Sequence, residues 1–384
     1  MIKFTSESVS EGHPDKIADQ ISDAILDVAL AKDQDARIAC ETMIKNSLVI
    51  VSGEISTTAV IDVAEIAGEV IKSIGYDDSS LGLDYKNISV INLISQQSQE
   101  IKQSVFDNKG NCIGAGDQGI MFGYACNETN VCMPAAIYFA HKLLLNLKEA
   151  RKSKSLAWLG PDAKCQVTVQ YNNDQLSGID NILISTQHKA DITHEQISFD
   201  IVSLIKQDKA IHPYLNSNTR YIINPSGSFV IGGPRVDCGL TGRKIIADTY
   251  GSYGRHGGGA FSGKDPSKVD RSAAYMARYI AKNIVAAGLA RKCEIQLAYG
   301  IGLPEPLSVS VNTFGTSALS EKELIIIIME NFELRPGKII KYLKLKTITY
   351  RDFTVYGHFG REELNLPWEA RDKVELLQKF SRYG

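Results

Sequence analysis

The sequence contains no long uninterrupted hydrophobic segment and no pair of closely spaced cysteines. No apolar run approaches the ~20 residues that a helix needs to cross a bilayer, and residues 1–10 show no apolar stretch typical of a secretory signal. The seven cysteines are odd in number and form no CxxC motif, a pattern typical of reduced thiols rather than of a disulfide framework. These absences predict a cytoplasmic protein that does not bind membranes.

Histidine and net charge are also scarce. Only seven histidines occur, without an HxxxH motif or a Cys/His cluster, which argues against a zinc site. The net charge is −2, so bulk electrostatic binding of nucleic acid is not expected. Apolar residues, in contrast, make up 44% of the 384 residues, enough for two or three structural units. Any charge-driven chemistry must therefore be local.

One order of elements, a helix followed by a hairpin and a second helix, is predicted three times. Apolar residues recur with helical spacing over 14–30, alternating strands follow, and a helix from 57 begins with threonines suited to capping. The predicted elements are helix 14–30, strands 37–44 and 48–55, helix 57–74; helix 134–152, strands 164–171 and 176–186, helix 193–208; and helix 266–287, strands 293–300 and 307–314, helix 320–332. Three α+β units with helices laid on antiparallel sheets would satisfy this order.

This order also predicts domain boundaries. We expect an N-terminal domain over 1–100, a mobile linker over 101–113, a central domain over 114–231 and a C-terminal domain over 232–384, as units that can be discontinuous in sequence. The polar segment 96–114 lies between an apolar strand and a Gly-rich turn. It is either an ordinary surface loop or a lid that closes over a site.

Glycine and charge occur together in four segments. The first, Glu11–Lys16, opens the first helix, and Pro14 fits the first helical turn, whose free N–H groups attract phosphate. His13, Asp15 and Lys16 there supply a proton donor, an oxygen ligand for Mg²⁺ and a cation. The alternative interpretation is a capped helix start with solvated charges.

The second and third segments are richer in glycine. Gly114–Gly119 would let the backbone approach a ligand, with Asp117 free to meet an ammonium group or a metal, although such spacing is also common in turns. Gly232–Lys244 combines glycines with Asp237 into a candidate anion nest. Its end, Arg243-Lys244, is either part of that nest or a solvated strand edge.

The fourth segment, 255–271, follows a predicted strand over 244–250 and precedes a helix, the context of a phosphate-binding loop. Gly258–Lys264 matches GxxxxGK, but Asp265 stands where a P-loop needs Ser or Thr for Mg²⁺. Cations are dense here and acids few, which suits a ligand with several phosphates. A solvated basic helix face is the alternative. The cations are Lys264, Lys268 and Arg271.

Two carboxylates are expected at buried strand positions. Glu41 lies inside the apolar strand 38–43, where an unpaired charge would be costly. Glu54, at the end of the partner strand, would carry the same cost if it were buried unpaired. A monovalent cation or a ligand ammonium group would relieve this cost.

Taken together, these segments resemble the signature segments of the S-adenosylmethionine synthetase family, in that family's order and at its spacing. The likeness extends from Phe4 to about Trp368, nearly the whole chain. The segments that carry it are 5–16, 114–119, 232–244, 257–270 and 356–361.

The resemblance implies a fold of three similar α+β domains about a pseudo-threefold axis, with helices on one face of antiparallel or mixed sheets. It implies a methionine adenosyltransferase: the methionine sulfur attacks C5′ of ATP, and the bound triphosphate is then hydrolysed to phosphate and pyrophosphate. It further implies two Mg²⁺ ions and one K⁺ ion per site. The expected assembly is a homo-oligomer, a dimer with shared active sites that commonly pairs into a homotetramer.

The resemblance also implies roles at the nucleotide. His13 is expected at the junction of the ribose O5′ and the triphosphate, Asp162 at the ribose hydroxyls and Phe229 against adenine. The phosphate chain is expected to meet Lys16, Lys164, Arg243, Lys244 and Lys264. Further ATP contacts are expected from Ser228, Asp237 and Ala260. The catalytic residues implied are His13, Lys164, Arg243 and Lys264.

The remaining implied roles concern methionine and metals. The methionine-binding set is Glu54, Gln97, Asp117, Asp237 and Lys268. Asp15 and Asp270 are the implied Mg²⁺ ligands, and Glu41 matches the K⁺ site. One departure from the family is the start of the mobile loop, where Gln97-Ser98-Gln99-Glu100 replaces the frequent Gln-Ser-Pro-Asp. Loss of that proline is expected to loosen the hinge.

Two other functions fit parts of the sequence. Gly258–Lys264 would also fit a P-loop phosphotransferase that releases ADP, against which the missing Ser or Thr counts. The basic Gly-rich stretch 243–278 would also fit an RNA-binding module, against which the lack of positive net charge counts.

Overall fold

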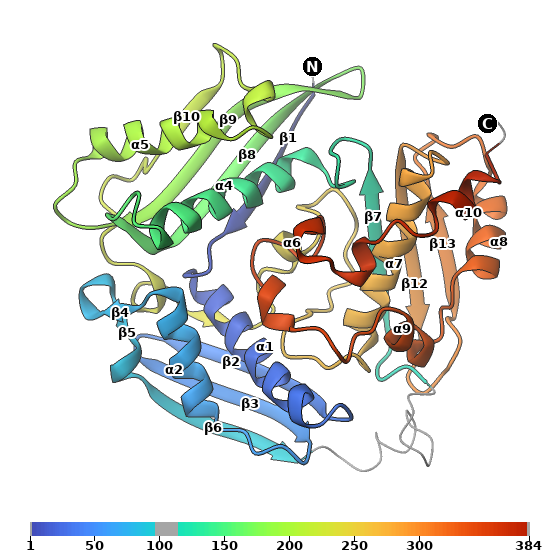
Figure 1. The fold of residues 1–384 in the computed structure, drawn as a ribbon, viewed down its shortest axis with the longest axis horizontal. Helices are drawn as coiled ribbons and strands as arrows, with labels where there is room; N and C mark the ends of the chain where they lie inside the picture. Colours follow the sequence, from blue (N-terminus) through green and yellow to red (C-terminus); the bar gives the residue numbers. More distant parts are fainter. Residues whose placement is uncertain (1, 97–113, 382–384) are drawn as a thin grey trace.

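The structure of the chain, a computed structural model, describes residues 2–96 and 114–381. Within these ranges the chain forms three lobes, each a small sheet with helices packed against it (Figure 1). The α+β class predicted from the order of elements is therefore confirmed. The segment predicted to be a linker or lid lies almost wholly outside the described residues.

The first lobe packs helices α1 (Pro14–Lys32) and α2 (Val63–Ile74) on a sheet of strand order β11-β2-β3-β6. The predicted apolar face of α1 is buried, with Ile17, Ile21 and Ile25 fully enclosed. Its strands are β2 (Arg37–Lys45), β3 (Leu48–Ser56), β6 (Ser89–Gln96) and β11 (Gly239–Leu240).

The second lobe packs α4 (Ala135–Lys152) and α5 (His194–Gln207) on a sheet of order β1-β8-β9-β10. Thr193 caps α5, since its side chain accepts the Gln196 backbone N–H at 3.3 Å. The strands are β1 (Ile2–Val9), β8 (Leu159–Asn172), β9 (Gln175–His188) and β10 (Arg220–Ile223).

The third lobe packs α7 (Val269–Ala286) and α8 (Glu321–Asn331) on a sheet of order β13-β12-β7. Its strands are β7 (Gly119–Cys126), β12 (Lys292–Tyr299) and β13 (Ser308–Asn312). The smaller elements are β4 (Asp77–Asp78), β5 (Leu83–Asp84), α6 (Ile245–Asp248), α9 (Pro336–Tyr342), α10 (Val374–Gln378) and short 3₁₀ turns.

The lobes exchange edge strands in a cycle. β1 comes from the first third of the chain but pairs antiparallel with β8 of the second lobe. β7 comes from the predicted central domain and pairs with β12 of the third lobe, and β11 comes from the predicted C-terminal domain and pairs with β2 of the first. Each lobe therefore depends on another third of the sequence, which joins all three lobes into one folding unit.

The predicted helix 57–74 begins later than expected. Thr57 and Thr58 do not cap it; both side chains donate to Asp33 at 2.9 and 3.3 Å. The cap is Asp62, which accepts the N–H groups of Ala64 and Glu65, both at 3.0 Å. Residues 57–62 instead tie the end of β3 to the loop after α1.

The strand predicted over 244–250 is wrong. Ile245–Asp248 forms the short helix α6, and Gly251 closes it by donating to the Ile246 carbonyl at 3.0 Å. A short apolar run cannot be assigned to strand or helix from its pattern alone. The helical turn buries Asp248 beside Lys16 of α1.

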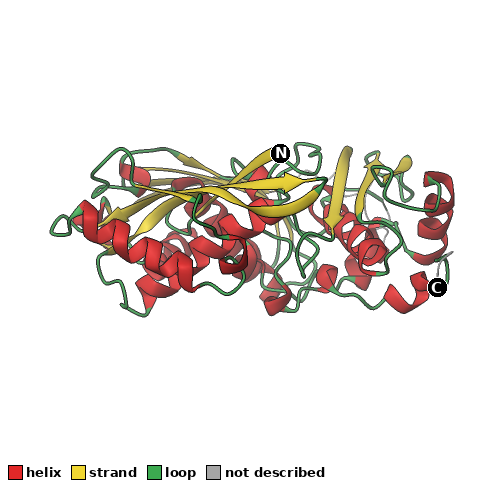
Figure 2. Ribbon diagram, turned by 90° about the horizontal axis from the view of Figure 1, so that it is seen from above, coloured by secondary structure: helices red, strands yellow, loops and turns green. Residues whose placement is uncertain are grey.

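The helices lie on one side of the molecule and the sheets largely on the other (Figure 2). The sheet of the first lobe therefore has an open face, on which Met43 (38% exposed), Ile91 (43%) and Leu93 (58%) lie uncovered. In the part of the chain that the structure describes, no helix is long and apolar enough to cross a membrane.

Candidate active site

Two of the four Gly-rich segments lie end to end along one edge of β2. Leu240 pairs with Met43, and the Thr241 N–H donates to the Thr42 carbonyl at 3.0 Å. Farther along the same edge, Lys264 bridges Ala39. The two attachment points, Met43 and Ala39, are four residues apart, or roughly 13 Å along an extended strand.

The other two segments reach the same region. Gly12 at the start of α1 donates to the Pro161 carbonyl at 3.2 Å, next to the predicted nucleotide residues of β8. Gly116 donates to the Ser267 carbonyl at 3.3 Å. Segments that are weak signals separately are therefore neighbours in space.

A stripe of four aspartates on α1 holds these loops in place. Asp15, Asp19, Asp23 and Asp27 recur every four residues, so they share one face of the helix. Each accepts backbone N–H groups of another segment. The bonds are Leu240 to Asp15 at 3.0 Å, Gly242 to Asp19 at 2.8 Å, Gly263 to Asp23 at 2.9 Å, and Tyr350 and Arg351 to Asp27 at 2.7 and 2.9 Å.

Sequence analysis identified only the first member of this stripe. Asp19, Asp23 and Asp27 are positioning residues that were not predicted from the sequence, because the helix was predicted from its apolar spacing alone. The sequence signal that could have found them is the repeat itself, since an aspartate at every fourth position places all four carboxylates on one helix face.

His13 caps α1 and is 1% exposed. Its Nδ1 accepts the Asp15 backbone N–H at 3.2 Å, which fixes the hydrogen on Nε2 if the ring is neutral. Burial, followed by the nearby charges of Lys244 and Lys164, lowers the pKa of His13 to about 3. Nε2 is buried and has no hydrogen-bond partner among the described residues. Nε2 of His13 is therefore a neutral N–H donor that can bond an acceptor atom of a substrate.

Asp15 lies at the centre of a charged group next to His13. Its carboxylate is paired with Lys244, and Arg243 lies 4.0 Å from it. Burial disfavours its ionisation, but the hydrogen bonds from Lys244 and the Leu240 N–H outweigh burial and lower its pKa. Asp15 is therefore ionised at neutral pH, with two cations beside it.

Asp162 forms the side of the site built by β8. It is 4% exposed, its Oδ2 accepts the Gly233 N–H at 2.8 Å, and its Oδ1 has no hydrogen-bond partner within the described part of the chain. Burial raises the pKa of Asp162 to about 6. Lys164 and Asp237 are close enough to act on it electrostatically, as they also act on His13. These predicted nucleotide residues are thus neighbours.

A second charged group lies at the other end of the β2 edge. Lys264 is paired with Asp270 at 2.5 Å and Lys268 with Asp265 at 2.6 Å. Asp265, which replaces the P-loop Ser or Thr, is fully buried and also accepts the Ile38 N–H at 2.8 Å. Its carboxylate anchors the loop to β2, so this segment is not a P-loop.

The remaining predicted residues, three for the nucleotide and Asp117 for methionine, lie on other loops. Phe229 is half-buried, and its backbone N–H donates to His188 at 2.9 Å, while Ser228 beside it is exposed. Ala260 lies against Gly242, where an added Cβ would come within 2.6 Å of it. Asp117 is exposed and accepts the Gln118 N–H at 2.7 Å.

The expectation that Glu41 and Glu54 are buried is wrong for the single chain. Side chains alternate along a strand, and Cys40 and Thr42 point into the core, so Glu41 points to the open face. Glu54 is also exposed on β3, opposite Ala39. Both carboxylates lie on the open sheet face together with Leu93.

Lys16 does not reach the site either. Its amine lies in the interior, paired with Asp248 and with Asp19 at 2.9 Å, and it donates to the Thr354 carbonyl at 2.8 Å. Burial alone would lower its pKa, but the two carboxylates raise it. These bonds occupy the three N–H groups of the amine, so a phosphate contact from Lys16 is not supported. Gln97 lies outside the described residues.

Metal ligands are present singly rather than as a preformed cage. Among residues 2–96 and 114–381, no group of three or more His, Cys, Asp or Glu side chains is arranged to hold a metal. Mg²⁺ in nucleotide enzymes is commonly held by one or two carboxylates together with substrate phosphates and water. Asp15 and Asp270, each an isolated carboxylate among cations, fit that mode.

Family models match almost the whole chain. Three family models match: the N-terminal domain of S-adenosylmethionine synthetase over residues 1–99, its central domain over 112–229 and its C-terminal domain over 231–370. The fold and site thus define a three-domain transferase that binds ATP. The chain belongs to the S-adenosylmethionine synthetase family, which makes S-adenosylmethionine from ATP and methionine and requires a divalent metal ion and potassium.

Proposed function

We propose that the cationic residues along the β2 edge form the triphosphate site of this methionine adenosyltransferase. The single observation that carries the proposal is that two segments distant from β2 in the sequence, one with Arg243 and Lys244 and one with Lys264, meet the same edge of that strand. Lys164 adds a fourth cation near His13. We assign the nucleoside to Asp162, Phe229 and Asp237; Lys164 and Asp237 both act electrostatically on Asp162.

The difficult part of the reaction is the departure of triphosphate from C5′. The methionine thioether is a neutral nucleophile that needs no general base, whereas negative charge grows on the bridging oxygen as the C5′–O bond breaks. Fixed cations stabilise this charge more in the transition state than in the ground state. The buried Nε2–H of His13 is suited to donate a hydrogen bond to that oxygen. The same cations then serve hydrolysis of the bound triphosphate.

Asp15 and Asp270 are the residues that would hold the two Mg²⁺ ions. When bound, Mg²⁺ supplies Lewis-acid stabilisation of the phosphate oxygens. Glu41 remains our candidate ligand for K⁺. Its exposure on the open sheet face is consistent with a site that a second subunit completes.

The methionine set is proposed at the Lys264 end of the strand edge. Glu54 opposes Ala39 on β3, and Ala39 bridges Lys264. Asp117 precedes β7 and follows Gly116, which is bonded to Ser267. Carboxylates here would stabilise the ammonium group of methionine and the new sulfonium. Asp237, Lys268 and Gln97 complete the set implied by the resemblance.

A homodimer with shared active sites is also part of the proposal. The open face of the first sheet carries both apolar side chains and the two proposed ligand carboxylates, Glu41 and Glu54. Covering it with a second copy would remove the apolar surface from water and enclose those carboxylates. Association of two such dimers into a homotetramer stays a prediction from the resemblance.

The test is the turnover of Arg243→Ala and Lys264→Ala. Each variant should lose at least a hundredfold in kcat, about 2.7 kcal/mol of transition-state stabilisation, with an unchanged circular dichroism spectrum. Lys209→Ala, which removes an exposed cation distant from the site, is the control and should keep full turnover. Near-normal turnover in either site variant would remove that residue from the proposed role.

A further inference from the structure

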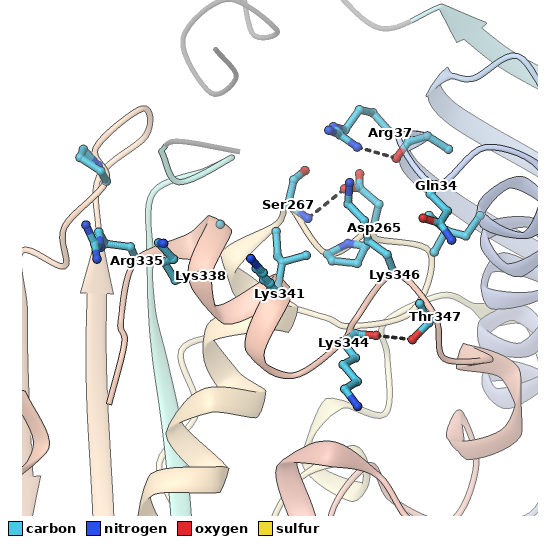
Figure 3. A pocket seen from close by; sticks show the side chains of 16 residues that line it. Gln34, Arg37, Asp265, Ser267, Arg335, Lys338, Lys341, Lys344, Lys346 and Thr347 are labelled. Carbon is cyan, nitrogen blue, oxygen red and sulfur yellow. Dashed lines mark hydrogen bonds between the residues drawn. The ribbon is translucent and has the colours of Figure 1, made fainter. Parts of the chain in front are cut away.

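A second cationic cavity lies next to the Lys264 end of the proposed active site, because residues 265–267 of its lining fall between Lys264 and Lys268. Its volume is about 770 Å³, within the range of small-molecule sites. It is lined by the end of α1, the start of β2, residues 265–267 and the segment 335–347 around α9 (Figure 3). None of the residues assigned above to ATP, methionine or metals lines it.

The lining carries six cations and one acid in the part of the chain that the structure describes. The acid, Asp265, is already neutralised by Lys268 at 2.6 Å. The cations are Arg37, Arg335, Lys338, Lys341, Lys344 and Lys346. The net charge of the chain is −2, so this local excess of positive charge distinguishes the cavity from the average surface of the protein.

Some of these cations have partners. Arg335 is paired with Glu333, and Lys346 with Asp35 at 2.6 Å. For Lys338 and Lys341, in contrast, no carboxylate of the described residues lies within 4 Å. They stand three residues apart on α9 and therefore on the same side of it. Figure 3 shows the side chains of Lys338 and Lys341 on the side of α9 that faces Ser267, whereas the amine of Lys344 points away from Ser267.

The rest of the lining is partly polar, with Gln34, Ser267 and Thr347, and partly apolar. Leu30, Ala36, Pro266, Pro304 and Ile340 contribute to the apolar part. Adjacent cations repel one another, and a multiply charged anion would relieve that repulsion. An inorganic phosphate would use only the cations, while a ligand with a ring system would also cover the apolar lining.

We propose that this cavity binds a small organic phosphate with two or more phosphoryl groups, of the nucleoside diphosphate class. The phosphates would meet Lys338 and Lys341, and the organic part would lie against the apolar lining. This would be a second nucleotide site on the enzyme, separate from the one that performs the reaction.

The test counts ADP molecules per chain by equilibrium dialysis of labelled ADP with the full-length protein. The wild type should bind one more ADP per chain than the double variant Lys338→Glu/Lys341→Glu, or should bind that additional ADP at least tenfold more tightly. Lys209→Glu/Lys322→Glu reverses the same number of exposed lysines elsewhere and should behave as the wild type. Lys338→Gln/Lys341→Gln provides a milder second variant, and a thermal melt verifies that each variant is folded.

Three results would overturn the proposal. The first is identical ADP binding by the wild type and both cavity variants. The second is equal loss of binding in the Lys209/Lys322 control. The third is displacement of the extra ADP by pyrophosphate at equal concentration, since that would mean that the apolar lining contributes nothing. Turnover at saturating ATP and methionine is measured in parallel and keeps this test separate from the active-site proposal.

Discussion

At the scale of single residues, the chemistry depends on groups whose protonation is set by their surroundings. His13 is enclosed beside two lysines, and both burial and positive charge disfavour its protonation. Its role is therefore that of a hydrogen-bond donor rather than of a cation. This assignment follows from the Asp15 N–H that occupies Nδ1.

The His13 ring should not titrate near neutrality. With a folded-state pKa of about 3, its Cε1–H resonance should stay constant between pH 8 and pH 5, identified by its loss in His13→Gln. Because the unfolded ring takes up a proton below roughly pH 6.5, this residue should favour unfolding progressively as the pH falls from there toward 3. A titration midpoint close to 6.5 in the folded enzyme would contradict this environment.

Asp15 should control the Mg²⁺ requirement. Asp15→Asn keeps an oxygen for the Leu240 N–H but loses the charge that binds a cation. The Mg²⁺ concentration for half-maximal turnover should rise about tenfold or more, measured at fixed ATP and methionine. Asp191→Asn, an exposed substitution elsewhere, should leave the titration where it was. An unchanged midpoint for Asp15→Asn would exclude it as a metal ligand.

At the scale of elements, α1 and α7 fix the geometry of the loops between them. Arg271 of α7 is 0% exposed and bonds both oxygens of Asp23 on α1, at 2.8 and 2.9 Å. Burial disfavours the Asp23 charge, but Arg271 outweighs burial and lowers the Asp23 pKa. Arg271 also donates to the Lys264 carbonyl at 3.1 Å. The pair therefore ties the loop that carries Lys264 to the core.

Arg271→Ala should destabilise the protein strongly. Removing one partner of a buried ion pair leaves the other uncompensated, at a cost of about 3–5 kcal/mol. The expected result is a matching fall in the free energy of unfolding, measured by chemical denaturation. Arg291→Ala removes an exposed arginine and should change it by less than about 0.5 kcal/mol. A loss below 1 kcal/mol for Arg271→Ala would show that the pair does not hold the loop.

Much of the element pattern could be predicted, since long helices such as α1, α4 and α7 carry clear apolar spacing. The short segment 244–250 could not, because a short apolar run fits either a strand or a helical turn. Strand pairing between distant thirds, such as β1 with β8, also leaves no local signal. In the site, His13 and the Gly-rich loops were found from their residue types, whereas the aspartate stripe was found only once its partners were visible.

At the scale of the whole molecule, the open sheet face is the feature that a single chain leaves unexplained. Its outward row includes Met43, Ile91 and Leu93, alongside Glu41. The burial predicted for Glu41 fails in the isolated chain because a strand exposes every second side chain. A second copy would supply the missing cover.

Charging this face should separate the subunits. Ile91→Lys/Leu93→Lys should shift the sedimentation coefficient to that of a monomer at micromolar concentration and lower turnover at least tenfold. Phe199→Lys changes an even more exposed apolar residue (71%) on α5 and should affect neither the sedimentation coefficient nor turnover. A variant that sediments as the wild type would place the subunit contact elsewhere.

The claim on which the whole account rests is that fixed cations along one strand edge receive the triphosphate. A crystal structure with methionine, Mg²⁺ and a non-hydrolysable ATP analogue tests it directly. The phosphate oxygens should lie within hydrogen-bonding distance of Arg243 and Lys264, with a metal ion on Asp15 and the bridging oxygen facing Nε2 of His13. A polyphosphate tail that points away from these residues would contradict the account.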